Sequence, residues 1–77
     1  MKITLRLVGH LKLEGVENGD AIDVAEGTTV RTLLDQHRMA PHHQRYVVPI
    51  VNGEEQKLSH VLEDGDELSL FLPIGGG

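Results

Sequence analysis

The chain of 77 residues has the length of one small domain, and because it contains no cysteine, disulfides cannot stabilise it. Its composition, 39% hydrophobic with one Phe, one Tyr and no Trp, is typical of a globular protein with an aliphatic core and excludes a disordered chain. The net charge of −5 and the scattered Lys and Arg residues argue against nucleic-acid binding, which needs clustered cations. We therefore expect protein partners.

The first predicted strand lies in MKITLRLV, where Ile3, Leu5 and Leu7 alternate with polar residues. A period of two is typical of a strand with one buried face. Its charged residues exclude a signal peptide and a membrane span, so we expect a cytoplasmic protein with no membrane contact. A second strand is predicted over residues 21–24. The residues between, 10–15, leave two interpretations open: an extension of the first strand or a helical turn.

The hydrophobic period changes to that of a helix in EGTTVRTLLDQHRM. Thr29 is a good N-cap, because its hydroxyl can accept a hydrogen bond from a free N–H of the first turn. The residues at helical spacing on one face are Val30, Leu33, Leu34 and His37. Since the residue before a proline disfavours helical backbone, the helix is predicted to end at Pro41.

Further strands are predicted in the second half of the chain. YVVPIV is a β-branched run, and the Asn52-Gly53 pair after it predicts a two-residue hairpin that returns through residues 54–58. Pro49 indicates an interrupted ladder or an edge position. The last strand, residues 67–72, places Phe71 on one face and three leucines on the other: Leu68, Leu70 and Leu72.

This order of two strands, one helix and further strands predicts an α+β domain, in which one main helix packs across a mixed sheet. We expect the first and last strands to be parallel central neighbours. The predicted core contains Ile3, Leu5, Val30, Leu33, Leu34, Leu68 and Leu70. The arrangement resembles the ubiquitin-like β-grasp fold, with residues 1–74 as the domain and residues 75–77 as a flexible C-terminal glycine tail.

Three stretches, GTTVRTLL, VNGE and LEDGDELSLFLPIGGG, together resemble the ThiS/MoaD family of sulfur carriers. They supply a helix-opening Thr-Val, a central Val-Asn, a Gly-Asp turn and a glycine end, in the order of the family. The resemblance covers essentially the whole chain. The aromatic-Leu-Pro-apolar approach to the glycines is closer to MoaD, the small subunit of molybdopterin synthase. The chain ends on three glycines, where the family usually has two.

The resemblance implies that an E1-like adenylyltransferase of the MoeB/ThiF type uses ATP and Mg²⁺ to adenylate the carboxylate of Gly77. A sulfur donor then displaces AMP, and the resulting thiocarboxylate supplies sulfur to an acceptor such as the molybdopterin synthase large subunit or thiazole synthase. The chain would be a carrier and not an enzyme, and would itself bind no cofactor. Gly75 and Gly76 would form a thin thread into a buried site, because a Cβ would widen the chain.

The residues before the glycines are predicted to bind partners. Phe71, Leu72, Pro73 and Ile74 would form a docking patch for the activating enzyme and the acceptor, since exposed aromatic side chains are typical of interfaces. The alternative is that Phe71 is an ordinary, partly buried sheet residue.

Two polar clusters have competing interpretations. Glu63, Asp64, Asp66 and Glu67 would steer the chain toward a basic partner or simply form a soluble turn. His37, His42 and His43 suggest a metal site, but no carboxylate or cysteine completes a ligand set. We therefore predict no metal and a solvated helix end.

Two functions of other classes remain open. One is a ubiquitin-like protein modifier joined to lysines through Gly77, and the other is a β-grasp interaction domain whose tail is not activated. An enzyme is least favoured, because the sequence has neither a nucleophile-base pair at a readable spacing nor a phosphate-binding glycine loop that opens a helix. The sulfur acceptor also stays open among a molybdopterin precursor, a thiazole precursor, a tRNA base and an amino-acid precursor.

Overall fold

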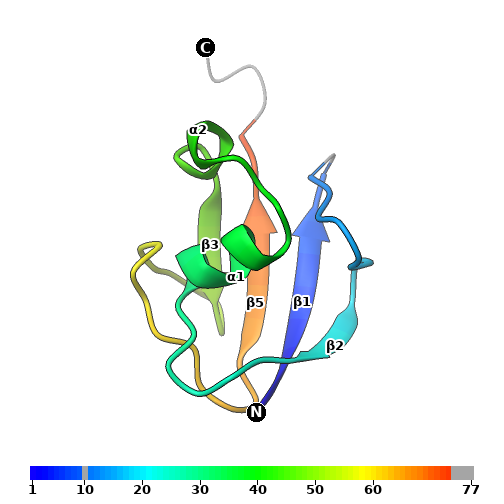
Figure 1. The fold of residues 1–77 in the computed structure, drawn as a ribbon, viewed down its shortest axis with the longest axis vertical. Coiled ribbons are helices and arrows are strands. Elements are labelled where there is room, and N and C mark those ends of the chain that lie inside the picture. Colours follow the sequence, from blue (N-terminus) through cyan, green and yellow to red (C-terminus); the bar gives the residue numbers. More distant parts are fainter. Residues whose placement is uncertain (10, 74–77) are drawn as a thin grey trace.

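The computed structural model describes residues 1–9 and 11–73, which form five strands and two short helices (Figure 1). The bounds of these elements are β1 (Lys2–Val8), β2 (Asp20–Asp23), α1 (Val30–Gln36), α2 (Pro41–Gln44), β3 (Val48–Val51), β4 (Glu54–Glu55) and β5 (Glu67–Phe71). The predicted α+β class is confirmed.

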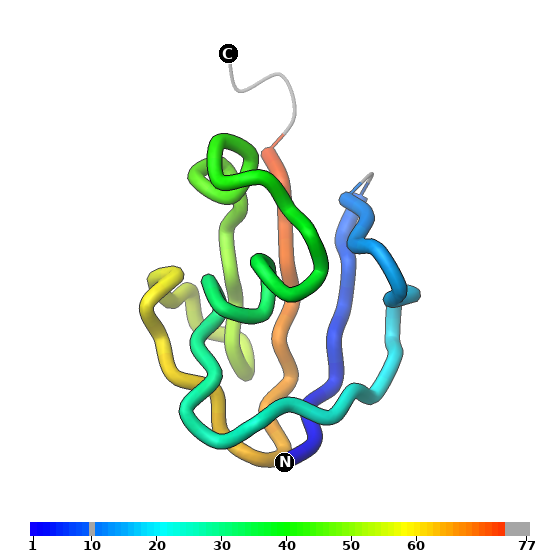
Figure 2. The backbone as a smooth tube through the Cα atoms, viewed as in Figure 1, coloured from blue at the N-terminus to red at the C-terminus, as the bar shows by residue number. Residues whose placement is uncertain are grey.

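The strands form a single mixed sheet in the order β2-β1-β5-β3-β4. β1 and β5 are parallel and lie at its centre, as predicted, while the other pairings are antiparallel. The helix α1 crosses one face of this sheet over β5 and β3 (Figure 1). Because the central strands run in the same direction, the N-terminus lies at the opposite end of the molecule from the end of β5 (Figure 2).

The hydrophobic core lies between α1 and the sheet and is aliphatic. Every residue predicted for it is at most 1% exposed: Ile3, Leu5, Val30, Leu33, Leu34, Leu68 and Leu70. A buried leucine or isoleucine contributes roughly 1.5–3 kcal/mol by its removal from water. In the absence of disulfides, this packing is what stabilises the chain.

The first helix begins as predicted but ends earlier. The Thr29 Oγ1 atom accepts a hydrogen bond from the Thr32 N–H at 3.1 Å and caps the N-terminus. The helix ends at Gln36, with His37 as its C-cap, so the predicted continuation to Pro41 is wrong. Pro41 is instead the first residue of α2, where a proline is well tolerated because that N–H would lack a helical partner anyway.

Gln44 fixes α2 against the end of α1. Its side chain is 1% exposed, and its Nε2 atom donates to the Asp35 Oδ1 atom at 2.6 Å and to the Met39 carbonyl at 2.9 Å. Buried polar groups are costly unless they are hydrogen-bonded. These two contacts therefore hold the short helix at the end of the sheet where β5 ends.

The predicted hairpin is present, but its second strand is short. Asn52 and Gly53 have φ angles of 51° and 87°, the left-handed pair that a tight two-residue turn requires. β4 contains only Glu54 and Glu55, so the strand predicted to continue to residue 58 is wrong. Pro49 precedes the two residues of β3 that pair with β4, and its carbonyl accepts a hydrogen bond from the Gln56 N–H at 2.9 Å.

The segment after β1 is neither a longer strand nor a helical turn. β1 ends at Val8, and Leu13 and Val16 form an isolated antiparallel bridge around a tight turn. Leu11 and Leu13 are nevertheless buried, so this connection contributes to the core.

Candidate functional site

Exposed apolar side chains cross the open face of the sheet where β1 and β5 end. Phe71, the last residue of β5, pairs with Val8 on β1 and with Val48 on β3. Paired residues on neighbouring strands point to the same face, and the strands lie about 4.8 Å apart. Val8 is 46% exposed, Phe71 is 39% exposed and Val48 is half-buried. We call these three residues the apolar row.

The alternation of β5 explains why Phe71 is exposed. Leu68 and Leu70 are fully buried beneath the helix side of the sheet, so Ser69 and Phe71 point to the open face. The prediction that Phe71 points away from the helix-covered face is confirmed. Within residues 1–9 and 11–73, no helix or strand covers this face, and the aromatic ring of Phe71 is exposed on it (Figure 1).

The other residues of the predicted docking patch do not all share this face. Leu72 is half-buried and packs against the hydrophobic core, on the side opposite to Phe71. Pro73 is exposed. The structure thus places successive residues of the patch on the two faces of the sheet, and their binding role remains a prediction.

Ile74 and the glycines Gly75, Gly76 and Gly77 lie outside the described residues. The predicted flexible tail, the thread into a partner and the chemistry at Gly77 therefore remain predictions.

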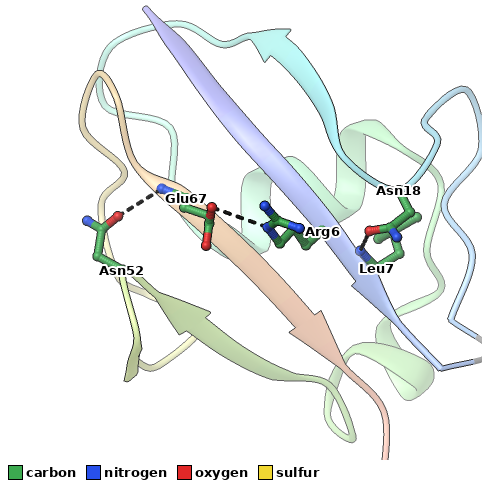
Figure 3. Close-up of polar contacts among 5 residues, drawn as sticks. All are labelled: Arg6, Leu7, Asn18, Asn52 and Glu67. Carbon is green, nitrogen blue, oxygen red and sulfur yellow. Dashed lines mark hydrogen bonds and ion pairs between the residues drawn. The ribbon is translucent and has the colours of Figure 1, made fainter.

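The opposite end of β5 is polar and held by hydrogen bonds. The Arg6 Nε atom on β1 lies 3.2 Å from the Glu67 Oε2 atom on β5. The Asn52 Oδ1 atom accepts a hydrogen bond from the Glu67 N–H at 2.9 Å. Further along β1, at Leu7, which pairs with Leu70, the Asn18 Oδ1 atom accepts one from the Leu7 N–H, also at 2.9 Å (Figure 3). Loop side chains therefore extend the hydrogen bonding of both central strands.

Three of the four acidic residues before and in β5 make contacts through their carboxylates: Glu67, which pairs with Arg6, and Asp66 and Asp64. The buried Asp66 carboxylate accepts hydrogen bonds from the Asn52 Nδ2 atom and the Glu63 N–H, each at 2.8 Å. The Asp64 Oδ1 atom accepts one from the Lys2 N–H at 2.8 Å. The acidic turn thus joins the start of β5 to the hairpin and to β1.

Two residues of the apolar row, Val8 and Val48, were not predicted from the sequence. Val8 had a usable signal, because it follows Lys2, Thr4 and Arg6 on the polar face of MKITLRLV and breaks their pattern. Val48 had none, since its position opposite Phe71 depends on the register between β3 and β5.

The histidines are placed apart from any complete ligand set. The His37 Nδ1 atom lies 2.9 Å from the Glu14 carbonyl, and His42 and His43 are exposed on α2. Within residues 1–9 and 11–73, no three His, Asp or Glu side chains are placed to hold a metal ion. Neither helix in this part of the chain has the length and apolar character needed to cross a bilayer.

Comparison with protein families decides what kind of chain this is. Residues 7–77 match the profile of the ThiS family, a match that includes the apolar row and the glycine end. The chain belongs to the ThiS family. The family resemblance seen in the sequence is confirmed, although a search of curated protein sequences found no match.

Three solved structures share the fold. The crystal structure of SAMP1 from Haloferax volcanii matches with a TM-score of 0.70 at 23% identity over the whole of both chains. A putative molybdopterin converting factor subunit 1 from Pyrococcus furiosus has a TM-score of 0.70 at 24% identity, covering 95% of this chain and 98% of that one. The third match is a chain in the complex of subunits 1 and 2 of the molybdopterin-converting factor from Helicobacter pylori 26695. It has a TM-score of 0.65 at 24% identity, with full coverage of both chains. This ThiS-family chain therefore has the predicted ubiquitin-like β-grasp fold.

Proposed function

We propose that this ThiS-family chain is a sulfur carrier whose terminal carboxyl group, on Gly77, is converted into a thiocarboxylate. Family membership over residues 7–77 supports this proposal. The observation that carries it is the position of the apolar row. Phe71 is exposed at the end of β5, two residues before Pro73, so a partner bound to the row meets the chain as it leaves the sheet.

The activation step requires only a carboxylate from this chain. An α-carboxyl group, with its ordinary pKa of about 3.3–3.7, is ionised at neutral pH. One carboxylate oxygen attacks the α-phosphorus of ATP, the bond from that phosphorus to the leaving pyrophosphate breaks, and an acyl adenylate forms. A sulfur donor then attacks the acyl carbon and releases AMP.

The rest of the chemistry belongs to the E1-like adenylyltransferase. Because this chain has a net charge of −5, its approach to ATP is electrostatically unfavourable unless the enzyme supplies Mg²⁺ and basic groups. The carrier contributes the docking surface and the glycines, whose missing Cβ atoms keep the chain narrow. Since the reaction consumes ATP, we place it in the cytoplasm.

The proposed acceptor is the molybdopterin synthase large subunit, with thiazole synthase as the alternative. The sequence before the glycines favours the former, and two of the structures with this fold are molybdopterin converting factor proteins. In the Helicobacter pylori structure, subunit 1 is in a complex with subunit 2.

Mass spectrometry of the intact chain tests the proposal. The chain is incubated with the adenylyltransferase of its own organism, ATP, Mg²⁺ and a sulfur donor. We expect the mass to change by the exchange of one oxygen for one sulfur, located at Gly77 by fragmentation. A chain extended past Gly77 by a short tag, or one with Gly76→Val, should not gain the sulfur. A tag before Met1 should be tolerated, because that end lies at the far side of the molecule (Figure 2).

Two results would contradict the proposal. Attachment of Gly77 to lysines of other proteins, without any thiocarboxylate, would identify a protein modifier. A chain that binds its partners equally well after removal of residues 74–77, and is never adenylated, would identify an interaction domain.

A further inference from the structure

A cavity lies behind the apolar row, on the helix side of the sheet. Its volume is about 310 Å³, large enough for an amino-acid side chain. The apolar part of its wall comes from Leu11, Leu13, Met39, Val47 and Leu72. Leu72 directly follows Phe71, so the cavity and the apolar row lie back to back at the end of β5.

Four segments meet around this cavity: the turn after β1, the end of α1, the segment from α2 to β3, and Leu72 after β5. The His37 Nδ1 atom, 2.9 Å from the Glu14 carbonyl, joins the first two of them. They lie side by side at the end of the molecule where β5 ends (Figure 2). The cavity is therefore built by tertiary contacts and includes Leu72, the first residue after β5.

The rim of the cavity is basic, although the chain is acidic overall. Lys12 and Arg38 both line it and are exposed. Neither forms an ion pair within residues 1–9 and 11–73, where the one ion pair joins Arg6 to Glu67. One carboxylate, that of Glu14, also lines the cavity, so the cations outnumber it. An anionic side chain would be attracted to this rim.

Arg38 occupies a position where the backbone favours glycine. Its φ angle is 63°, and the Arg38 N–H donates to the Asp35 carbonyl while the Met39 N–H donates to the Leu34 carbonyl, each at 3.0 Å. This is the Schellman arrangement, in which the left-handed residue is usually glycine because a Cβ is unfavourable there. The backbone conformation therefore does not explain why this position holds an arginine.

We propose that this cavity is a second docking site for the activating enzyme, and that it receives an apolar side chain flanked by a carboxylate. The inference rests on the proposed function. The carboxylate pairs with Arg38 and Lys12, and the apolar group contacts Leu72 and its neighbours. Two segments of the enzyme would then hold the end of β5 between them. One would contact Phe71 on the open face of the sheet, and the other would contact Leu72 on the helix side.

Charge reversal tests the basic rim. We compare the Michaelis constant for the carrier, in adenylation by the enzyme of the same organism, between wild type, Arg38→Glu and Arg31→Glu. Arg31 is a matched control, because it is an exposed arginine on α1, while Arg38 follows the end of that helix, and because it lines a different cavity. We expect Arg38→Glu to raise the constant roughly tenfold and Arg31→Glu to leave it nearly unchanged. High salt should reduce the difference, since it screens exposed charges.

A second variant separates binding from folding. Arg38→Gly removes the charge and relieves the backbone, so it should melt no lower than wild type and still raise the Michaelis constant. Met39→Phe fills part of the cavity and obstructs the apolar group of the enzyme, so it should also raise the Michaelis constant. If Arg38→Glu, Arg38→Gly and Met39→Phe were all adenylated with the wild-type Michaelis constant, this inference would be overturned and the proposed function would stand. A lower Michaelis constant in Arg38→Gly would also overturn it, and would indicate that the cavity retains the chain's own tail. A wild-type chain that is never adenylated would remove the proposed function and this inference together.

Discussion

The two ends of β5 differ in what their side chains do. At its start, Asp66, Asn52 and Glu67 exchange hydrogen bonds of 2.8–2.9 Å between the acidic turn, the hairpin and the strand. At its end, Phe71 pairs with Val8 across the central ladder, and both side chains remain exposed. The five residues of β5 therefore join a closed polar network to an open apolar surface.

Under the proposed function, this difference places stability at one end and recognition at the other. Hydrogen-bonded groups at the polar end contribute to folding because leaving them unpaired is costly. An exposed aromatic at the other end contributes little to folding but presents apolar area that a partner can bury. A strand fixed at its start can hold its last residues in a defined position, as the proposed carrier function requires.

The core beneath both ends should show the largest effect. Leu70→Ala removes a fully buried side chain between α1 and the sheet, which should lower the free energy of unfolding by about 2–5 kcal/mol. Urea unfolding monitored by circular dichroism measures it. Leu33→Ala should cost a similar amount from the helix side, whereas Leu72→Ala should cost less because that side chain is half-buried. Equal losses for Leu70 and Leu72 would contradict the described packing.

Substitutions at the polar end should lower the unfolding free energy and leave partner binding unchanged. Asp66→Ala leaves the Glu63 N–H and the Asn52 amide without their acceptor, at a cost of about 1–3 kcal/mol in unfolding free energy. Asp23→Ala, which removes an exposed carboxylate on β2, should change it far less. Both variants should keep the wild-type Michaelis constant in adenylation. A raised constant for Asp66→Ala under folding conditions would mean that this end also contacts the enzyme.

A substitution at the apolar end should weaken partner binding and change the unfolding free energy less. Phe71→Ala should weaken binding to the activating enzyme roughly tenfold, since truncated aromatic anchors at interfaces commonly cost more than 1 kcal/mol. Its unfolding free energy should change less than that of Leu70→Ala, because the ring is 39% exposed. Isothermal titration calorimetry measures the affinity, and Ser69→Ala, on the same face, is the control. Unchanged affinity would favour the interpretation of Phe71 as an ordinary sheet residue.

Much of the fold could be predicted because local patterns and tertiary packing agree. The period of two in β1 and β5 identifies Leu5, Leu68 and Leu70 as core residues, and the helical period from Thr29 identifies Leu33. The exposed face of Phe71 follows from the same alternation. Sequence patterns succeed here because each buried side chain repeats at the spacing of its own element.

The failures occur where a boundary or a neighbour leaves no pattern in the sequence. The helix ends before Arg38 because a Schellman motif closes there, yet arginine gives no signal for a left-handed residue. The partnership of Val48 with Phe71 needs the strand register, and the cavity lined by Leu11 and Leu72 needs the whole fold. For the site, the aromatic could be predicted, but its neighbours on the other strands could not.

Loss of the exposed ion pair should have the smallest effect on the unfolding free energy. Its measurement would show whether the ion pair or the hydrogen bonds stabilise the polar end. The Arg6 Nε and Glu67 Oε2 atoms are 3.2 Å apart, but the two side chains are 53% and 49% exposed (Figure 3). Exposed pairs contribute little, because water and salt screen their attraction and two long side chains lose mobility. Arg6→Gln should therefore lower the unfolding free energy by less than about 0.5 kcal/mol, measured by urea unfolding at low salt and again at high salt. Asn52→Ala removes the hydrogen bond to the buried Asp66 carboxylate and the one from the Glu67 N–H. It should therefore lower the unfolding free energy by more than Arg6→Gln at both salt concentrations. If Arg6→Gln cost as much as Asn52→Ala and lost its effect in high salt, the polar end would be held by the ion pair, and the hydrogen-bond network of Asp66 would not be what fixes the start of β5.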